Sequence, residues 1–282
     1  MKLLRYGPVG QEKPGLMDED DNIRDLSAHI GDISGDVLRP EGLEKIAALN
    51  VSDLPVVDGS PRFGACVGDI GKFMCIGLNY TDHAAESGMP VPDEPILFAK
   101  FNSAISGPND DVIMPRGSTK LDWEVEFGIV MGSKAKYIPE DQALEHVAGY
   151  CVINDVSERA YQLEGTGQWV KGKACDSFGP VGPWLVTKDE ISDPKNLRLW
   201  LEVNGTRYQD GNTSTMIFSA AHIVSYLSNL FTLYPGDVIA TGTPPGVGAG
   251  LKPPVFLQIG DKMRLGIDGL GEQNQVVVTD KT

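Results

Sequence analysis

Two glutamates one residue apart are the first candidates for chemistry in this chain. Glu124 and Glu126 lie in segment 122–131, where Trp123 and every second residue after it are apolar. This period of two predicts a β-strand whose side chains alternate between its faces. The two carboxylates then share one face and repel each other unless a positive charge lies between them. The alternative is a half-buried strand with its polar face in water.

A third carboxylate follows another expected strand. The apolar run 149–154 ends at Asp155, a position well placed to bring it beside Glu124 and Glu126. Three carboxylates without sulfur or imidazole select a hard cation, Mg²⁺, Mn²⁺ or Ca²⁺. Three negative charges against two positive ones leave room for water and a bidentate substrate, as a catalytic metal site requires. A structural calcium site would use more protein oxygens.

A histidine and a glutamate three residues apart are the next candidates. Thr81 is expected to cap a short helix that Gly88 ends, and His83 and Glu86 then lie on one face of it. A histidine oriented by a carboxylate suits a general base that takes a proton from water. Two solvated neighbours on a surface helix are the alternative.

Further polar residues could bind an anionic substrate. In the helical segment 156–164, Arg159 and Gln162 follow Asp155 at helical spacing. Arg159 either binds a substrate carboxylate or forms a salt bridge with Asp155 or a neighbour, and the sequence leaves both open. Lys100 ends the expected strand 95–100 and is a further substrate-binding candidate.

Two glycine-containing loops complete the candidates. Lys171 and Lys173 lie in loop 169–180, where either could stabilise an oxyanion, although a solvated loop is the alternative. Loop 242–250 matches no nucleotide-binding motif. Its glycines would let backbone N–H groups and Thr243 approach an anionic ligand, unless it is an ordinary turn.

Composition limits the protein class. The 282 residues are 41% hydrophobic and 22% charged, and 33 Gly and 19 Pro favour a mainly β globular fold with some α. A net charge of −15 argues against nucleic acid and anionic membranes as partners. No segment has the length of a signal peptide or membrane span, so a cytoplasmic location is expected. Four scattered cysteines without a C-x-x-C motif are expected to be reduced.

Two units are expected along the chain. Residues 1–68 have short strands and a helix at 41–50, which indicate a small α+β unit, and the proline- and glycine-containing segment 54–64 is expected to be its linker. Residues 69–282 then form the catalytic domain. Its best helix is expected at 217–230, which carries His222 in a structural role.

Taken together, five segments resemble, in order, the motifs of the fumarylacetoacetate hydrolase family. They are 76–86 (IGLNYTDHAAE), 123–126 (WEVE), 154–162 (NDVSERAYQ), 171–173 (KGK) and 241–248 (TGTPPGVG). The resemblance covers about residues 72–270. It departs from the family at Ala174 and Cys175, where many relatives have serine or glycine and then phenylalanine, and at His222, where an acid is common. The N-terminal unit is similar to that of the longer bacterial members.

The resemblance implies a fold and a set of residue roles. The fold is a mixed β-sandwich roll that forms a homodimer. The resemblance implies a divalent metal bound by Glu124, Glu126 and Asp155. It implies a catalytic pair, His83 and Glu86, and a catalytic lysine, Lys173. The ligand pocket would be lined by Arg159, Gln162 and Thr243.

The expected activity is metal-dependent cleavage of a carbon–carbon bond in a 2,4-diketo acid, either an acylpyruvate or a 2,4-diketo-3-deoxy sugar acid. The metal would bind the 1-carboxylate and 2-oxo oxygens, His83 would activate water for attack at C4, and Lys173 would meet the oxyanion. The products are pyruvate and a second acid. The alternatives are a ureidoglycolate lyase, an oxaloacetate decarboxylase, a diketo-acid isomerase, and a metal-stabilised ligand-binding protein without catalysis.

Overall fold

The fold is built on two β-sheets that pack face to face. The structure is a computed structural model that describes residues 1–88 and 90–281. The strands of the larger sheet are β1 Lys2–Tyr6, β2 Lys13–Met17, β3 Ile23–Asp25, β4 Phe73–Gly77, β5 Ile96–Lys100, β6 Ile105–Ser106, β9 Val125–Met131, β10 Val147–Asn154, β12 Gly179–Thr187 and β15 Val238–Ala240. Their order is β3-β2-β1-β12-β10-β9-β15-β4-β5, with β6 beside β12.

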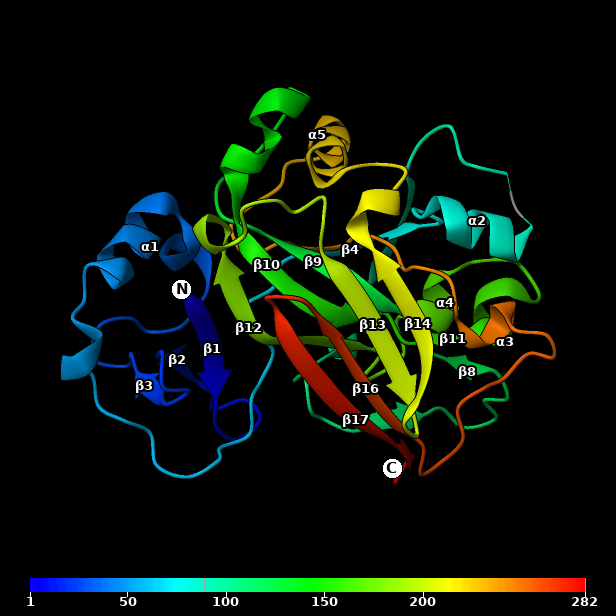
Figure 1. The fold of residues 1–282 in the computed structure, drawn as a ribbon, viewed down its shortest axis with the longest axis horizontal. Helices are drawn as coiled ribbons and strands as arrows, with labels where there is room; N and C mark the ends of the chain where they lie inside the picture. Colours follow the sequence, from blue (N-terminus) through cyan, green and yellow to red (C-terminus); the bar gives the residue numbers. More distant parts are fainter. Residues whose placement is uncertain (89, 282) are drawn as a thin grey trace.

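A five-stranded sheet covers one face of the larger sheet (Figure 1). Its order is β14-β13-β16-β17-β7, and its strands are β7 Val112–Met114, β13 Arg198–Val203, β14 Thr206–Asn212, β16 Lys262–Ile267 and β17 Gly271–Thr279. The short strands β8 Leu121–Asp122 and β11 Ser157–Glu158 pair separately. The expected mainly β fold with mixed sheets is confirmed.

Helices lie around the sheets. They are α1 Pro40–Ala47, α2 Thr81–Ser87, α3 Arg159–Leu163, α4 Val170–Lys173, α5 Ala220–Leu230 and the 3₁₀ segment η4 Glu140–His146. Figure 1 shows α2, α3 and α4 together at one end of the sheets, away from the N-terminal elements. None of the helices formed by the described residues has both the length and the apolar character that crossing a bilayer requires.

Strand β9 lies at the centre of the larger sheet, between β10 and β15. Val125 and the alternate residues after it pack into the core shared with the second sheet, as the period of two predicts. The opposite face is buried as well, because all seven residues of β9 are buried. Glu126 is therefore on a covered face of the strand and not on a solvated one.

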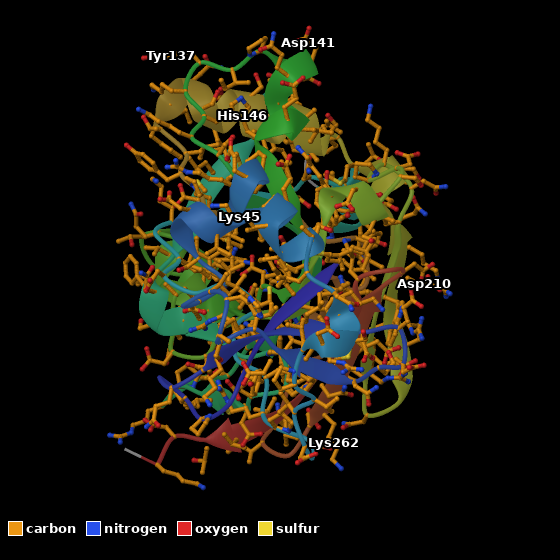
Figure 2. All side chains as sticks on the ribbon, turned by 90° about the vertical axis from the view of Figure 1, so that its left-hand side faces the viewer. Lys45, Tyr137, Asp141, His146, Asp210 and Lys262 are labelled. Carbon is orange, nitrogen blue, oxygen red and sulfur yellow. The ribbon has the colours of Figure 1, made fainter. Side chains whose placement is uncertain are left out.

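The N-terminal segment continues the larger sheet. Strand β1 pairs with β12 through Leu3 and Leu185, and Leu3 belongs to the same apolar cluster as Ile153 of β10. Figure 2, which faces this side of the molecule, shows α1 with Lys45 lying across it. Segment 54–64, the expected linker, bridges to the N-terminal strands at Val56 and Phe63. The boundary at residue 68 stays a prediction, since one sheet runs across it.

Arg62 joins the N-terminal segment to the rest of the chain. Its guanidinium lies 2.9 Å from Glu12 Oε1 and binds both oxygens of Asp110 at 2.7 and 2.5 Å. It also donates to the carbonyl oxygen of Gly7. Glu12 is almost buried, with 8% of its side chain exposed, so the loss of Arg62 would leave a carboxylate in a poorly solvated place.

Arg62→Met is expected to destabilise the fold by roughly 2 kcal/mol, because two partly buried carboxylates lose their shared partner. Thermal unfolding should show a fall in Tm of about 4 °C. Arg198→Met is the control, since Arg198 pairs with Asp210 on the surface, where about half of each side chain is exposed, and such a pair contributes little. Equal losses in the two variants would contradict the bridging role of Arg62.

The effect of Arg62 should also depend on pH. Burial raises the pKa of the Glu12 carboxyl, but the Arg62 hydrogen bond and the charges of Arg5 and Arg62 outweigh it and lower that pKa below its ordinary 4.5. A depressed pKa stabilises the folded state above the ordinary value, and this contribution is lost as the pH falls through the folded value. The Tm difference between wild type and Arg62→Met should therefore shrink in acid. A difference constant from about pH 7 to about pH 3 would count against the pairing.

Candidate active site

Three carboxylates meet at the ends of β9 and β10. Oxygens of Glu124, Glu126 and Asp155 all lie within 4.8 Å of one another, and the three residues are buried. The pairing of β10 with β9 explains this, since Asn154 is opposite Val125 and the Asp155 N–H donates to the Glu124 carbonyl at 2.9 Å. The expected carboxylate cluster is thus brought together by strand register.

Lys173 supplies a positive charge between two of these carboxylates. Its Nζ lies 2.8 Å from Glu124 Oε2 and 2.7 Å from Asp155 Oδ2. The lysine belongs to α4 and not to an open loop, and α4 comes so close to α3 that a Cβ at Gly172 would lie 2.5 Å from the Gln162 backbone nitrogen. Burial lowers the pKa of Lys173, but the charges of Asp155 and Glu124 outweigh burial and raise the pKa above its ordinary value. The ammonium therefore stays protonated.

Arg159 forms the salt bridge that the sequence left open. Its Nη2 lies 2.6 Å from Glu124 Oε1 and its Nε lies 2.8 Å from Asp122 Oδ2. Its Nη1 donates to Gln162 Oε1 at 3.0 Å. Burial raises the pKa of Glu124, yet Lys173 and Arg159 outweigh it and lower the pKa to about 2. Glu124 is therefore ionised, and much of the guanidinium is engaged by the protein.

Lys100 does not line the cavity, in contrast to the substrate-binding role expected for it. Its side chain is fully buried behind Asp155, where Nζ lies 2.6 Å from Asp155 Oδ1. The same nitrogen donates to the carbonyl oxygens of Val156 at 3.0 Å and Lys173 at 2.5 Å. The ammonium therefore supports Asp155 and α4 from within the protein, because β5 turns this side chain inward.

His83 and Glu86 form the expected pair on α2. His83 Nδ1 lies 3.2 Å from Glu86 Oε2. Both oxygens of Glu86 accept from the Gly246 N–H, at 3.1 and 3.2 Å. A Cβ at Gly246 would lie 1.9 Å from the Tyr208 carbonyl oxygen, so only glycine fits there. Loop 242–250 thus orients the carboxylate that orients the histidine.

A cavity of about 580 Å³ joins the two groups. Glu124, Glu126 and Lys173 line its inner end, and His83 and Glu86 line it from α2. Phe98 and Trp169 add an apolar wall, with ring centroids 5.4 Å apart in an edge-to-face contact. Arg159, Gln162 and Thr243 also line the cavity.

The hydroxyl of Thr243 is occupied by protein partners. Its Oγ1 donates to the Val125 carbonyl oxygen at 2.8 Å and accepts from Gln209 Nε2 at 2.8 Å. The neighbouring Gly242 N–H donates to Glu126 Oε2 at 2.8 Å. The backbone of this loop therefore binds a carboxylate of the protein itself, which the sequence did not indicate.

Asp122 is a site residue that the sequence reasoning missed. It is fully buried beside Arg159 and accepts hydrogen bonds from the N–H groups of Gly248 and Ala249. The signal was present, because Asp122 shares the even parity of Glu124 in the segment predicted as a strand. Its partners could not be read in the same way, since they come from a loop more than a hundred residues later.

The three carboxylates fit a hard divalent cation. Burial, Asp155 and Glu124 raise the pKa of Glu126 well above its ordinary value, which shows that its negative charge is poorly compensated by the protein. Among the described residues, no group donates a well-aligned hydrogen bond to the buried Asp155 Oδ1, although Lys100 lies close to it. Oxygen ligands of this kind suit Mg²⁺, Mn²⁺ or Ca²⁺.

Comparison with known proteins identifies the family. The profile of the fumarylacetoacetate (FAA) hydrolase C-terminal domain matches residues 72–278. The chain belongs to the fumarylacetoacetate hydrolase family. A relative from Burkholderia lata, provisionally named as a hydrolase, is 62% identical over 276 residues, which are 98% of each chain. The family resemblance of the motifs is thereby confirmed.

Solved structures of the family have the same fold. A 2-hydroxyhepta-2,4-diene-1,7-dioate isomerase from Mycobacterium marinum is 32% identical, with a TM-score of 0.76 and all of both chains covered. A maleylpyruvate hydrolase from Sphingobium sp. SYK-6, whose structure contains a manganese(II) ion and pyruvate, is 29% identical, with a TM-score of 0.82 and all of both chains covered. The family therefore includes hydrolases and isomerases.

Mn²⁺ is expected to bind once per chain and to stabilise the fold, by about 2.7 kcal/mol at a free concentration of 100 times its Kd. Glu126→Gln should weaken Mn²⁺ binding more than about 100-fold, because it removes an anionic oxygen from the cluster. Calorimetric titration and thermal unfolding measure both quantities. Glu202→Gln is the control, since Glu202 of β13 pairs with Arg207 of β14, and neither residue lines the cavity. Full Mn²⁺ affinity in Glu126→Gln would exclude this cluster as the site.

Proposed function

We propose that this protein is a divalent-metal-dependent hydrolase that cleaves a 2,4-diketo acid to pyruvate and a carboxylic acid. The observation that carries the proposal is a cavity lined both by Lys173, Glu124 and Glu126 and by the His83–Glu86 pair of α2, with Asp155 buried beside the two glutamates. A structural metal site needs neither the histidine nor the open cavity. A ligand-binding protein without catalysis is therefore the weaker alternative.

Glu124, Glu126 and Asp155 would hold Mg²⁺ or Mn²⁺, with Ca²⁺ as a further candidate. When bound, the ion supplies a positive charge that polarises the keto acid. The maleylpyruvate hydrolase, which contains manganese and pyruvate, supports this assignment. The cluster itself attracts a cation, because its buried groups are four carboxylates (Asp122, Glu124, Glu126 and Asp155) against three cations (Lys100, Arg159 and Lys173). Because the pKa of Glu126 is raised, all four carboxylates would be ionised together only with a divalent ion bound, and the sum of these charges would then be +1, which favours an anionic substrate.

His83 would act as the general base in this proposal. Glu86 accepts the hydrogen bond at Nδ1, which leaves Nε2 as the nitrogen that takes a proton from water. The water would then attack the C4 carbonyl carbon. The Gly246 N–H holds Glu86 in place during this step, so the histidine keeps its orientation.

Lys173 would meet the negative charge that develops on the C4 oxygen. Its ammonium is protonated and fixed between Glu124 and Asp155, so it is available to an oxyanion without reorganisation. Arg159 and Gln162 line the same cavity and orient the substrate oxygens. The C3–C4 bond breaks when the C4 oxygen returns its electrons, and the pyruvate enolate that leaves takes up at C3 the proton that His83 removed from water.

The group beyond C4 defines two substrate classes, acylpyruvates and 2,4-diketo-3-deoxy sugar acids. The isomerase relative supports diketo-acid isomerisation as the second candidate function. Isomerisation needs the same enolate but no attack by water. The ureidoglycolate lyase and oxaloacetate decarboxylase reactions are further proposals for the same site. A homodimer in the cytoplasm, which binds this small anionic keto acid and neither nucleic acid nor membrane, completes the proposal.

With Mg²⁺ or Mn²⁺, wild-type protein is expected to cleave an acylpyruvate or a 2,4-diketo-3-deoxy sugar acid and to release pyruvate. The loss of the diketo-enol absorbance of the substrate and the pyruvate formed measure the reaction. His83→Ala should lower kcat by about 10²–10⁴-fold, because the general base is lost. Its Mn²⁺ affinity should stay within about two-fold of wild type, because His83 is not among the carboxylate ligands.

His222→Ala is the matched control. His222 pairs with Glu140 at 3.0 Å and stacks on Phe218 of the segment before α5, away from the cavity lining. Its kcat should equal that of the wild type. Unchanged turnover in His83→Ala would refute the general-base assignment. Loss of absorbance without pyruvate release would favour the isomerase instead.

A further inference from the structure

Asp122 is a buried carboxylate for which the proposed reaction has no use. Its exposed fraction is 0%, and it does not line the cavity. Desolvating a carboxylate is costly, so four good donors around one buried aspartate require an explanation. The donors belong to two different parts of the site.

One pair of contacts faces the metal-binding cluster. Asp122 Oδ2 accepts from Arg159 Nε at 2.8 Å, and the other end of that guanidinium lies 2.6 Å from Glu124 Oε1. Arginine presents its donors in a rigid planar fork. The position of Asp122 therefore sets the position of the guanidinium, which in turn sets one oxygen of Glu124.

The other contacts face loop 242–250. Asp122 Oδ1 accepts from the Gly248 N–H at 2.7 Å, and Oδ2 accepts from the Ala249 N–H at 3.0 Å. A Cβ at Gly248 would lie 2.8 Å from Asp122 Oδ1, so glycine is needed for this approach. Two residues earlier, the Gly246 N–H holds Glu86. Asp122 thus fixes the loop that orients Glu86, the partner of His83.

The backbone next to Asp122 strengthens the connection. The Trp123 N–H also donates to Asp122 Oδ1 at 2.8 Å, and the Trp123 indole donates to the Gly246 carbonyl oxygen at 3.1 Å. Both residues directly precede Glu124 in the chain. The loop and Glu124 are therefore both attached to Asp122 and Trp123.

We propose that Asp122 is a positioning residue that holds two parts of the site in a fixed relation to each other. It holds Glu124 through Arg159, and it holds loop 242–250 through the backbone amides of Gly248 and Ala249. Asp122 does not touch substrate or metal. It keeps the inner end of the cavity, where the cation binds, aligned with the outer end, where Glu86 orients His83. The inference extends the proposed function, but its main readouts do not depend on turnover.

Asp122→Asn tests the proposal with a side chain of the same size. The amide has one accepting oxygen where the carboxylate has two, so in either orientation an NH₂ group faces donors. Mn²⁺ affinity of the folded protein should fall by about 10–100-fold, as for other groups that orient a metal ligand. Hydrogen exchange of a peptide spanning residues 246–251 should become faster.

Asp237→Asn is the matched control. Asp237 is also a buried aspartate with 1% exposure, and it accepts from the backbone N–H groups of Lys72 and Tyr234 and from Lys72 Nζ. It lies at the opposite end of β15 from the loop. Its Asn variant should lower Tm while leaving Mn²⁺ affinity and exchange at 246–251 unchanged. If Asp122→Asn behaves in the same way, Asp122 is only structural and the proposal fails.

Arg159→Lys separates the two arms and serves if Asp122→Asn does not fold. A lysine keeps the charge but replaces the rigid planar fork with one nitrogen on a flexible stem, so Mn²⁺ affinity should fall by about ten-fold. Exchange at 246–251 should stay near the wild-type rate, because Asp122 still binds the loop. Wild-type Mn²⁺ affinity in Arg159→Lys would overturn the inference that Asp122 positions Glu124 through Arg159. If wild-type protein binds Mn²⁺ but releases no pyruvate, the proposed function fails while these readouts still decide the role of Asp122.

Discussion

Seven ionisable side chains lie together at the ends of β9 and β10 and are almost completely buried. They are Lys100, Asp122, Glu124, Glu126, Asp155, Arg159 and Lys173. Their desolvation is tolerated because each carboxylate contacts a cation or a backbone amide, as Glu124 contacts Lys173 and Arg159. The compensation is incomplete at Glu126, whose pKa is raised by burial and by its acidic neighbours. The protein therefore holds a site whose remaining charge favours a cation.

Such a site needs a dry and rigid support on both faces of the strand. The second sheet covers one face of β9, and the cluster that includes Leu3 and Leu16 covers the other face of the larger sheet. The N-terminal segment thus contributes to the apolar layer that covers this face of the larger sheet. This gives the segment a physical role without any contact to the cavity.

The sequence predicted the parts of the site that depend on local spacing. The alternation of apolar residues predicted a strand over 122–131, the capping residues a helix that carries His83, and the apolar run a strand that ends before Asp155. The structure has the helix and the second strand, but it divides the first strand into β8 and β9, with Trp123 and Glu124 between them. Two features could not be predicted in this way. The direction of Lys100 and the donors to Asp122 depend on how distant segments pack, which no local pattern encodes.

The two ends of the cavity are held with different strength, and this follows from where their residues come from. Glu126 belongs to the central strand β9, and Glu124 and Asp155 directly adjoin the ends of β9 and β10, whose neighbours on both sides fix the backbone. His83 belongs to a short helix that is hydrogen-bonded to loop 242–250 through Glu86 and the Gly246 N–H. An isolated helix of this length is unstable in water. The orientation of His83 therefore depends on loop 242–250, and the loop depends on the strand segment that also carries the metal-facing carboxylates.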